Sequence, residues 1–108
     1  MTGVVSNRTV SVAVGAGSPL ATVGGTALVQ TTSGSFLATR ISDVAFSVLT
    51  AVCTHEGCTI TDVSGTTFIC PCHGSQFSTG GAVLKSPATK SLTAFASDLS
   101  NGALTITF

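Results

Sequence analysis

The residues best able to bind a metal are concentrated in one short stretch of this chain. Residues 53–73 contain all four cysteines and both histidines of the 108-residue sequence. They belong to two short motifs, Cys-Thr-His-Glu-Gly-Cys over 53–58 and Cys-Pro-Cys-His-Gly-Ser over 70–75. Thiolate suits zinc and iron–sulfur clusters, and imidazole suits zinc and iron. We therefore expect the rest of the chain to be a scaffold for these two motifs.

The number and spacing of these residues favour a two-iron cluster over a single metal ion. Four cysteines and two histidines exceed the needs of one tetrahedral ion, and their spacing differs from that of zinc fingers. Each iron of a [2Fe–2S] cluster needs two protein ligands, and two histidines can replace two cysteines on one iron. One cysteine of each motif would then remain. Two alternatives stay open at this point, which are two structural disulfides and a mononuclear zinc site.

The two motifs together resemble those of Rieske iron–sulfur proteins of the high-potential, disulfide-containing branch. The resemblance implies a [2Fe–2S] cofactor with four protein ligands, namely Cys53 and Cys70 on one iron and His55 and His73 on the other. It also implies a disulfide between the remaining cysteines, Cys58 and Cys72. The oxygenase branch of the family lacks this second pair of cysteines, so it is the weaker match.

Four further positions correspond to residues that tune the cluster potential in this family. Ser75 matches a serine whose hydroxyl donates a hydrogen bond to a bridging sulfide. Gly57 and Gly74 have no side chain, which would let backbone N–H groups approach the cluster sulfurs. Phe77 stands where quinol-oxidising members often carry a tyrosine that donates to a cysteine ligand. Because phenylalanine lacks this donor, we expect a potential below the top of the family's range.

The remaining sequence predicts an all-β fold. Short β-branched stretches alternate with glycine and serine turns, and no segment shows a helical period. We expect strands over residues 9–14, 26–31, 35–41, 45–52, 59–63, 66–70, 92–97 and 103–108, and an extended segment over 76–84 with a turn at Gly80-Gly81. Asn101-Gly102 is a strong signal for a type I′ hairpin turn. This pattern predicts an antiparallel β sandwich or barrel, and the resemblance implies the Rieske type with a small inserted cluster-binding subdomain.

The length of 108 residues predicts one domain. By resemblance it is a single Rieske domain over 1–108, with a base formed by 1–51 and 83–108 and a cluster-binding subdomain over about 52–82. Only 7% of the residues are charged and the formal net charge is zero, so no nucleic-acid partner is expected.

No membrane segment is expected in this sequence. The longest uninterrupted apolar run is three residues, whereas a transmembrane helix needs about 20. Met1-Thr2-Gly3 lacks the basic and apolar start of a signal peptide. We expect either a chain trimmed to its soluble domain or a naturally soluble form. Because disulfides persist outside the reducing cytosol, we expect an extracytoplasmic site, periplasmic or membrane-associated and facing outward, if the full-length protein is anchored or exported.

The resemblance implies one-electron transfer, as the soluble domain of a quinol–cytochrome c reductase-type Rieske subunit. Its partner would be a redox protein, either a cytochrome or another oxidoreductase subunit, with quinol as a candidate donor. The alternative is a soluble Rieske-type ferredoxin, or a small electron-transfer subunit of another oxidoreductase such as arsenite oxidase. Glu56 favours the alternative, because quinol-docking members often have leucine at this position beside His55. In either role the chain is an electron-transfer protein or subunit rather than a complete enzyme.

Overall fold

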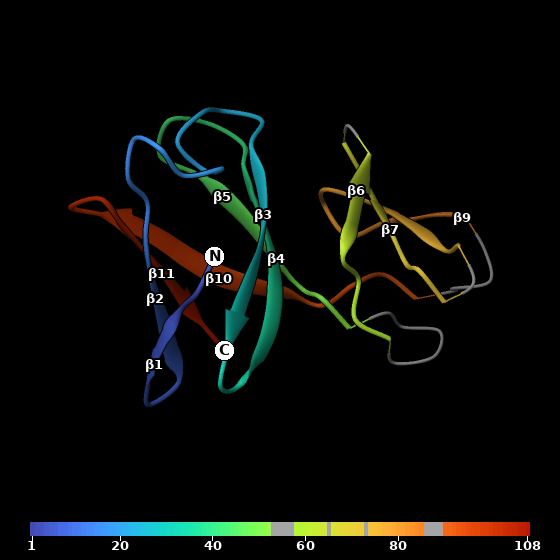
Figure 1. The fold of residues 1–108 in the computed structure, drawn as a ribbon, viewed down its shortest axis with the longest axis horizontal. Coiled ribbons are helices and arrows are strands. Elements are labelled where there is room, and N and C mark those ends of the chain that lie inside the picture. Colours follow the sequence, from blue (N-terminus) through green and yellow to red (C-terminus); the bar gives the residue numbers. More distant parts are fainter. Residues whose placement is uncertain (53–57, 65, 73, 86–89) are drawn as a thin grey trace.

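The computed structural model describes residues 1–52, 58–64, 66–72, 74–85 and 90–108, and these residues form two antiparallel β-sheets (Figure 1). The larger sheet consists of β1 (Val4–Ser6), β2 (Thr9–Ala13), β3 (Thr26–Thr31), β4 (Gly34–Arg40), β5 (Phe46–Thr50), β10 (Ala94–Ser100) and β11 (Ala103–Thr107). Their spatial order is β1-β2-β11-β10-β5-β4-β3. The smaller sheet follows chain order and consists of β6 (Asp62–Ser64), β7 (Thr67–Ile69), β8 (Gln76–Ser78) and β9 (Val83–Lys85).

The all-β prediction is confirmed, and the Asn-Gly turn is where the sequence placed it. Asn101 has φ 52° and Gly102 has φ 74°, as a type I′ turn between β10 and β11 requires. The expected extended segment over 76–84, with its turn at Gly80-Gly81, is present as two strands, β8 and β9. They are separated by a turn in which Gly81 adopts φ 94°, a conformation that favours glycine. None of the described residues belongs to a helix able to cross a membrane.

The first three residues nearly close the larger sheet into a barrel. Thr2 pairs in parallel with Gln30 on the edge strand β3. The N–H of Gly3 donates to the Gln30 carbonyl at 3.0 Å, and the N–H of Gln30 donates to the Met1 carbonyl at 2.8 Å. This segment leads directly into β1 at the opposite edge of the sheet. It therefore covers the N–H and C=O groups that β3 would otherwise leave without strand partners.

The interior of this barrel is filled by one apolar core, here called the base core. Its buried members are Val10, Val12, Leu20, Ala27, Val29, Phe36, Ala38, Val48, Leu104 and Ile106. Valine alternation along β2 supplies Val10 and Val12 to one face, as the period of a half-buried strand predicts. The ring of Phe36 packs edge-on against Phe95, with 5.3 Å between the ring centroids.

A second core lies on the opposite face of β4 and β5 and joins the two sheets. Its buried members are Leu37, Leu49, Ala51, Ile60, Phe68, Cys70, Phe77 and Leu92. The smaller sheet stands beside the barrel in Figure 1. A hydrogen bond from the Ser47 hydroxyl to the Thr79 carbonyl (2.8 Å) connects β5 to the turn that follows β8. The smaller sheet is thus attached to the base both by apolar packing and by hydrogen bonding.

We expect Gly3→Ala to destabilise the protein by about 1–3 kcal/mol, the usual cost of overpacking a core. A Cβ atom at Gly3 would overlap Cγ1 of Val10 and would lie 3.0 Å from Cγ2 of Thr31. Urea unfolding followed by circular dichroism measures the change. Gly17→Ala is the control, since nothing lies within 4 Å of a Cβ at that position. Equal midpoints for the two variants would mean that the first residues do not pack on the barrel as described.

Candidate metal centre

The two cysteine- and histidine-containing motifs flank the first hairpin of the smaller sheet. Residues 53–58 lie between β5 and β6, and residues 70–75 lie between β7 and β8. The predicted site residues that lie outside the described part of the chain are Cys53, His55, Gly57 and His73. Glu56 also lies outside it. The site residues that the structure describes are Cys58, Cys70, Cys72, Gly74 and Ser75, together with Phe77 in β8.

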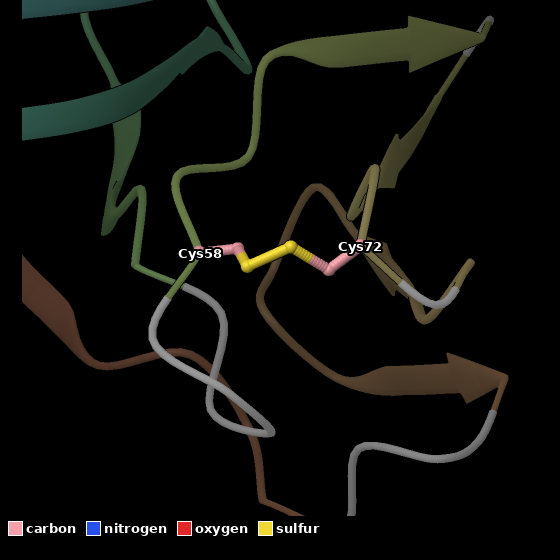
Figure 2. The surroundings of a disulfide bond; sticks show 2 residues. All are labelled: Cys58 and Cys72. Carbon is pink, nitrogen blue, oxygen red and sulfur yellow. A yellow bond between two sulfur atoms is a disulfide. The ribbon is translucent and has the colours of Figure 1, made fainter.

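The disulfide predicted between the motifs is present. Cys58 and Cys72 are bonded through their Sγ atoms, with 6.5 Å between their Cα atoms, inside the usual range for a disulfide. Figure 2 shows the bond crossing from one loop to the other. Because Cys58 ends the first motif and Cys72 lies within the second, the bond holds the two motifs next to each other.

Cys70 begins a tight loop whose ends are hydrogen-bonded together. The N–H of Cys70 donates to the Ser75 carbonyl at 2.8 Å, and the N–H of Gly74 donates to the Cys70 carbonyl at 3.0 Å. Gly74 has φ 75°, which a residue with a Cβ rarely adopts. Its lack of a side chain is therefore needed for the turn itself. Cys70 is 2% exposed and belongs to the second core, outside the Cys58–Cys72 disulfide.

Two of the predicted tuning residues are buried, namely Ser75 at the end of the second motif and Phe77 two residues after it. Ser75 is 1% exposed and Phe77 is 0% exposed. Phe77 lies directly opposite Phe68 in the β7–β8 pairing, and both rings belong to the second core. A hydroxyl is costly to bury without a hydrogen bond. The burial of Ser75 therefore distinguishes it from an ordinary turn serine, whose hydroxyl is solvated. Phe77 is a core residue of the sheet as well as a neighbour of the ligand loop.

This arrangement fits a two-iron cluster. The disulfide joins two loops, and each loop contributes one further cysteine and one histidine in the sequence. Thiolate and imidazole pairs from two such loops are the ligands of a Rieske [2Fe–2S] centre. A single zinc ion would leave part of this donor set unused.

The comparison with protein families agrees with this chemistry. Residues 10–96 match the Rieske [2Fe–2S] domain. The match covers most of the chain, and the chain therefore belongs to the Rieske [2Fe–2S] domain family. The prediction of a [2Fe–2S] cofactor is thereby confirmed.

Relatives of this chain are named as subunits of a larger complex. The cytochrome b6-f complex iron-sulfur subunit of Prochlorococcus marinus (strain MIT 9301) is 37% identical over 87 residues, which is 77% of this chain and 49% of that relative. The subunit of the same name from Synechococcus elongatus is 47% identical over 57 residues, which is 52% of this chain and 32% of that relative. The chain spans about half the length, or less, of these curated relatives.

Solved structures agree with the fold. The cyanobacterial plasma membrane Rieske protein PetC3 from Synechocystis PCC 6803 superposes with a TM-score of 0.67 at 28% identity, over 77% of this chain and 86% of that one. A chain from the complex of reduced oxygenase and oxidized ferredoxin in carbazole 1,9a-dioxygenase gives a TM-score of 0.73 over 94% of both chains. At 21% identity this second likeness concerns the fold alone.

The two motifs gave no indication of the residues from the larger sheet that share a core with Cys70. Leu37 and Leu49 come from the larger sheet, yet both belong to the core that contains Cys70. The available signal is the apolar run Phe36-Leu37-Ala38, because a strand buried on both faces has continuous rather than alternating apolar residues.

We expect replacement of both disulfide cysteines, Cys58→Ala with Cys72→Ala, to lower the free energy of unfolding by about 3 kcal/mol, the loop-closure estimate for a loop of roughly 15 residues. The separation in sequence is 14 residues. Urea unfolding of the cluster-loaded protein measures the loss, and iron analysis shows whether the cluster becomes labile. Wild-type protein treated with a reductant is the control and should behave like the variant. Two free thiols in untreated, cluster-loaded wild type would contradict the disulfide.

Proposed function

We propose that this chain carries single electrons through its [2Fe–2S] cluster, as an electron-transfer domain rather than a complete enzyme. The proposed ligands are Cys53, His55, Cys70 and His73. When bound, the cluster supplies a site that accepts and releases one electron. The Cys58–Cys72 disulfide carries the proposal, because it holds the two ligand-bearing loops together.

The proposed ligands favour a high reduction potential through their charge. Two thiolates contribute two negative charges, and two neutral imidazoles contribute none. Four cysteines would contribute four, so an added electron would meet more repulsion. Net charge is one of the factors that set the potential of these centres, and Rieske centres span about −150 to +300 mV. Because Phe77 has no hydroxyl, we expect a reduction potential below the top of that range.

We propose a cluster-binding subdomain over about 52–82, which contains β6, β7 and β8 and their loops, inserted into a base formed by 1–51 and 83–108. In support, β6, β7 and β8 follow one another in the sequence, whereas the larger sheet uses strands from before and after them. Strand β9 pairs with β8 and extends the small sheet as far as Lys85.

For the physiological role we propose a Rieske subunit of a quinol–cytochrome c reductase-type complex, with a cytochrome as partner and quinol as donor. The names of the relatives support this role, and the disulfide supports an extracytoplasmic position. Glu56 and Phe77 favour the second candidate, a soluble Rieske-type carrier or small subunit of another oxidoreductase. A quinol-site inhibitor that alters the cluster's spectrum in membranes would support the first role, and an unaltered spectrum would support the second.

We expect His73→Ala to abolish the Rieske spectrum, because the variant loses a proposed iron ligand. Electron paramagnetic resonance (EPR) of the reduced protein and iron content measure the loss, and His55→Cys should lose the native spectrum as well. Ser100→Ala is the control, an exposed position at the end of β10. A histidine variant that kept the native low-field resonances would refute the ligand assignment.

We expect Ser75→Ala to lower the midpoint potential and Phe77→Tyr to raise it. A hydrogen bond to cluster sulfur stabilises the reduced form more, because that form carries one more negative charge. A difference of about 1–3 kcal/mol between redox states, bounded by the strength of charged hydrogen bonds, corresponds to about 40–130 mV for one electron. Redox titration measures the shifts.

Ser78→Ala is the control for the serine, since the Ser78 hydroxyl accepts a hydrogen bond from the Ala82 N–H within the turn after β8. An unchanged potential in Ser75→Ala would make Ser75 a structural residue of the loop only. An unchanged potential in Phe77→Tyr would mean that the added hydroxyl does not reach a cluster ligand.

A further inference from the structure

Strand β5 presents two neighbouring side chains to two different cores. Val48 lies opposite Ala38 and belongs to the base core, whereas Leu49 lies opposite Leu37 and belongs to the second core. Val48 and Leu49 are each 1% exposed. Consecutive residues of a strand point to opposite faces, so the second core has a wall made by the base sheet.

Leu49 packs closely against the turn that joins β8 to β9. A Cβ atom at Gly81 would lie 3.1 Å from Cδ2 of Leu49, tighter than ordinary van der Waals contact. The Gly81 carbonyl accepts a hydrogen bond from the N–H of Leu92 at 2.9 Å. Two positions earlier on β5, the hydroxyl of Ser47 bonds the Thr79 carbonyl of the same turn. The outer face of β5 thus holds this turn at alternate residues.

The same core reaches the second ligand loop. Strand β8, which precedes this turn, contributes Phe77, and the loop that contains Cys70 leads into β8. Phe77 and Phe68 are both 0% exposed and pair across β7 and β8. Because protein interiors are close-packed and transmit strain, a cavity created at Leu49 should shift the side chains around Cys70.

We propose that Leu49, with Leu37 beside it, is a positioning residue for the Cys70 thiolate. The base barrel then does more than support the smaller sheet, since its outer face forms the apolar wall behind one iron ligand. This proposal rests on the proposed role of Cys70 as an iron ligand. Leu49, a residue of the larger sheet, thus affects the spectrum and the lifetime of the cluster.

The test compares the same substitution in the two cores. Leu49→Ala opens space in the second core, and Leu104→Ala removes the same atoms from the base core, where Leu104 is 0% exposed. Both variants should unfold more easily than wild type. Visible absorbance measures the rate of cluster loss, under conditions where the two variants have equal free energies of unfolding. This rate should be about tenfold higher in Leu49→Ala, equivalent to about 1.4 kcal/mol.

EPR gives a readout that general destabilisation does not move. The g values of the reduced cluster should shift in Leu49→Ala and stay at their wild-type values in Leu104→Ala. Leu49→Met, a volume-conserving replacement, should restore both the wild-type g values and the slow loss. If the alanine variants do not fold, Leu49→Val and Leu104→Val form the milder pair, with the same expected contrast.

Failure of the positioning role and failure of the ligand assignment give different results. Equal rates of loss and identical spectra in the Leu49 and Leu104 variants would overturn the positioning role while the function stands. A Cys70→Ser variant that kept the wild-type Rieske spectrum would overturn the ligand assignment, and the positioning role with it.

Discussion

The structure depends on keeping together the two loops that carry the cysteine- and histidine-containing motifs. Cys58 and Cys72 provide this constraint covalently, between the loop that follows β5 and the loop between β7 and β8. The β6–β7 hairpin between the loops already returns the chain to the same end of the small sheet. Closing the loop by a disulfide removes conformations from the unfolded chain, and it limits how far the two motifs can separate in the folded one.

A sheet as small as β6–β9 requires support from outside. Each of its four strands is three residues long, and such short strands bury too little apolar surface to be stable alone. The support is the outer face of β4 and β5, where Leu37 and Leu49 complete a core shared with Phe68 and Phe77. The strands β4 and β5 therefore form a wall common to both cores.

The chemistry was more predictable from the sequence than the packing. Cysteine and histidine are rare here and their spacing is specific, so the motifs predicted the family, the cofactor and the disulfide. The Asn101-Gly102 turn was predictable because its positive φ values favour those residue types. The burial of Leu37 and Leu49 was less predictable, because the apolar run Phe36-Leu37-Ala38 indicates a strand buried on both faces but nothing local shows which residues cover its second face. The turn at Gly80-Gly81 between β8 and β9 was predictable from the paired glycines, whereas the close approach of Gly81 to Leu49 was not.

The position of Cys70 shows why the ligand loop and the second core belong together. A thiolate buried among apolar side chains is costly unless a positive partner offsets its charge, and Cys70 is almost fully enclosed. Iron would provide that partner, and binding it requires the thiol to lose its proton. The core in turn excludes water from the thiolate, and solvent exposure is one of the factors that set the potential of an iron–sulfur centre. Apolar packing at Leu49 and metal binding at Cys70 are therefore expected to stabilise each other.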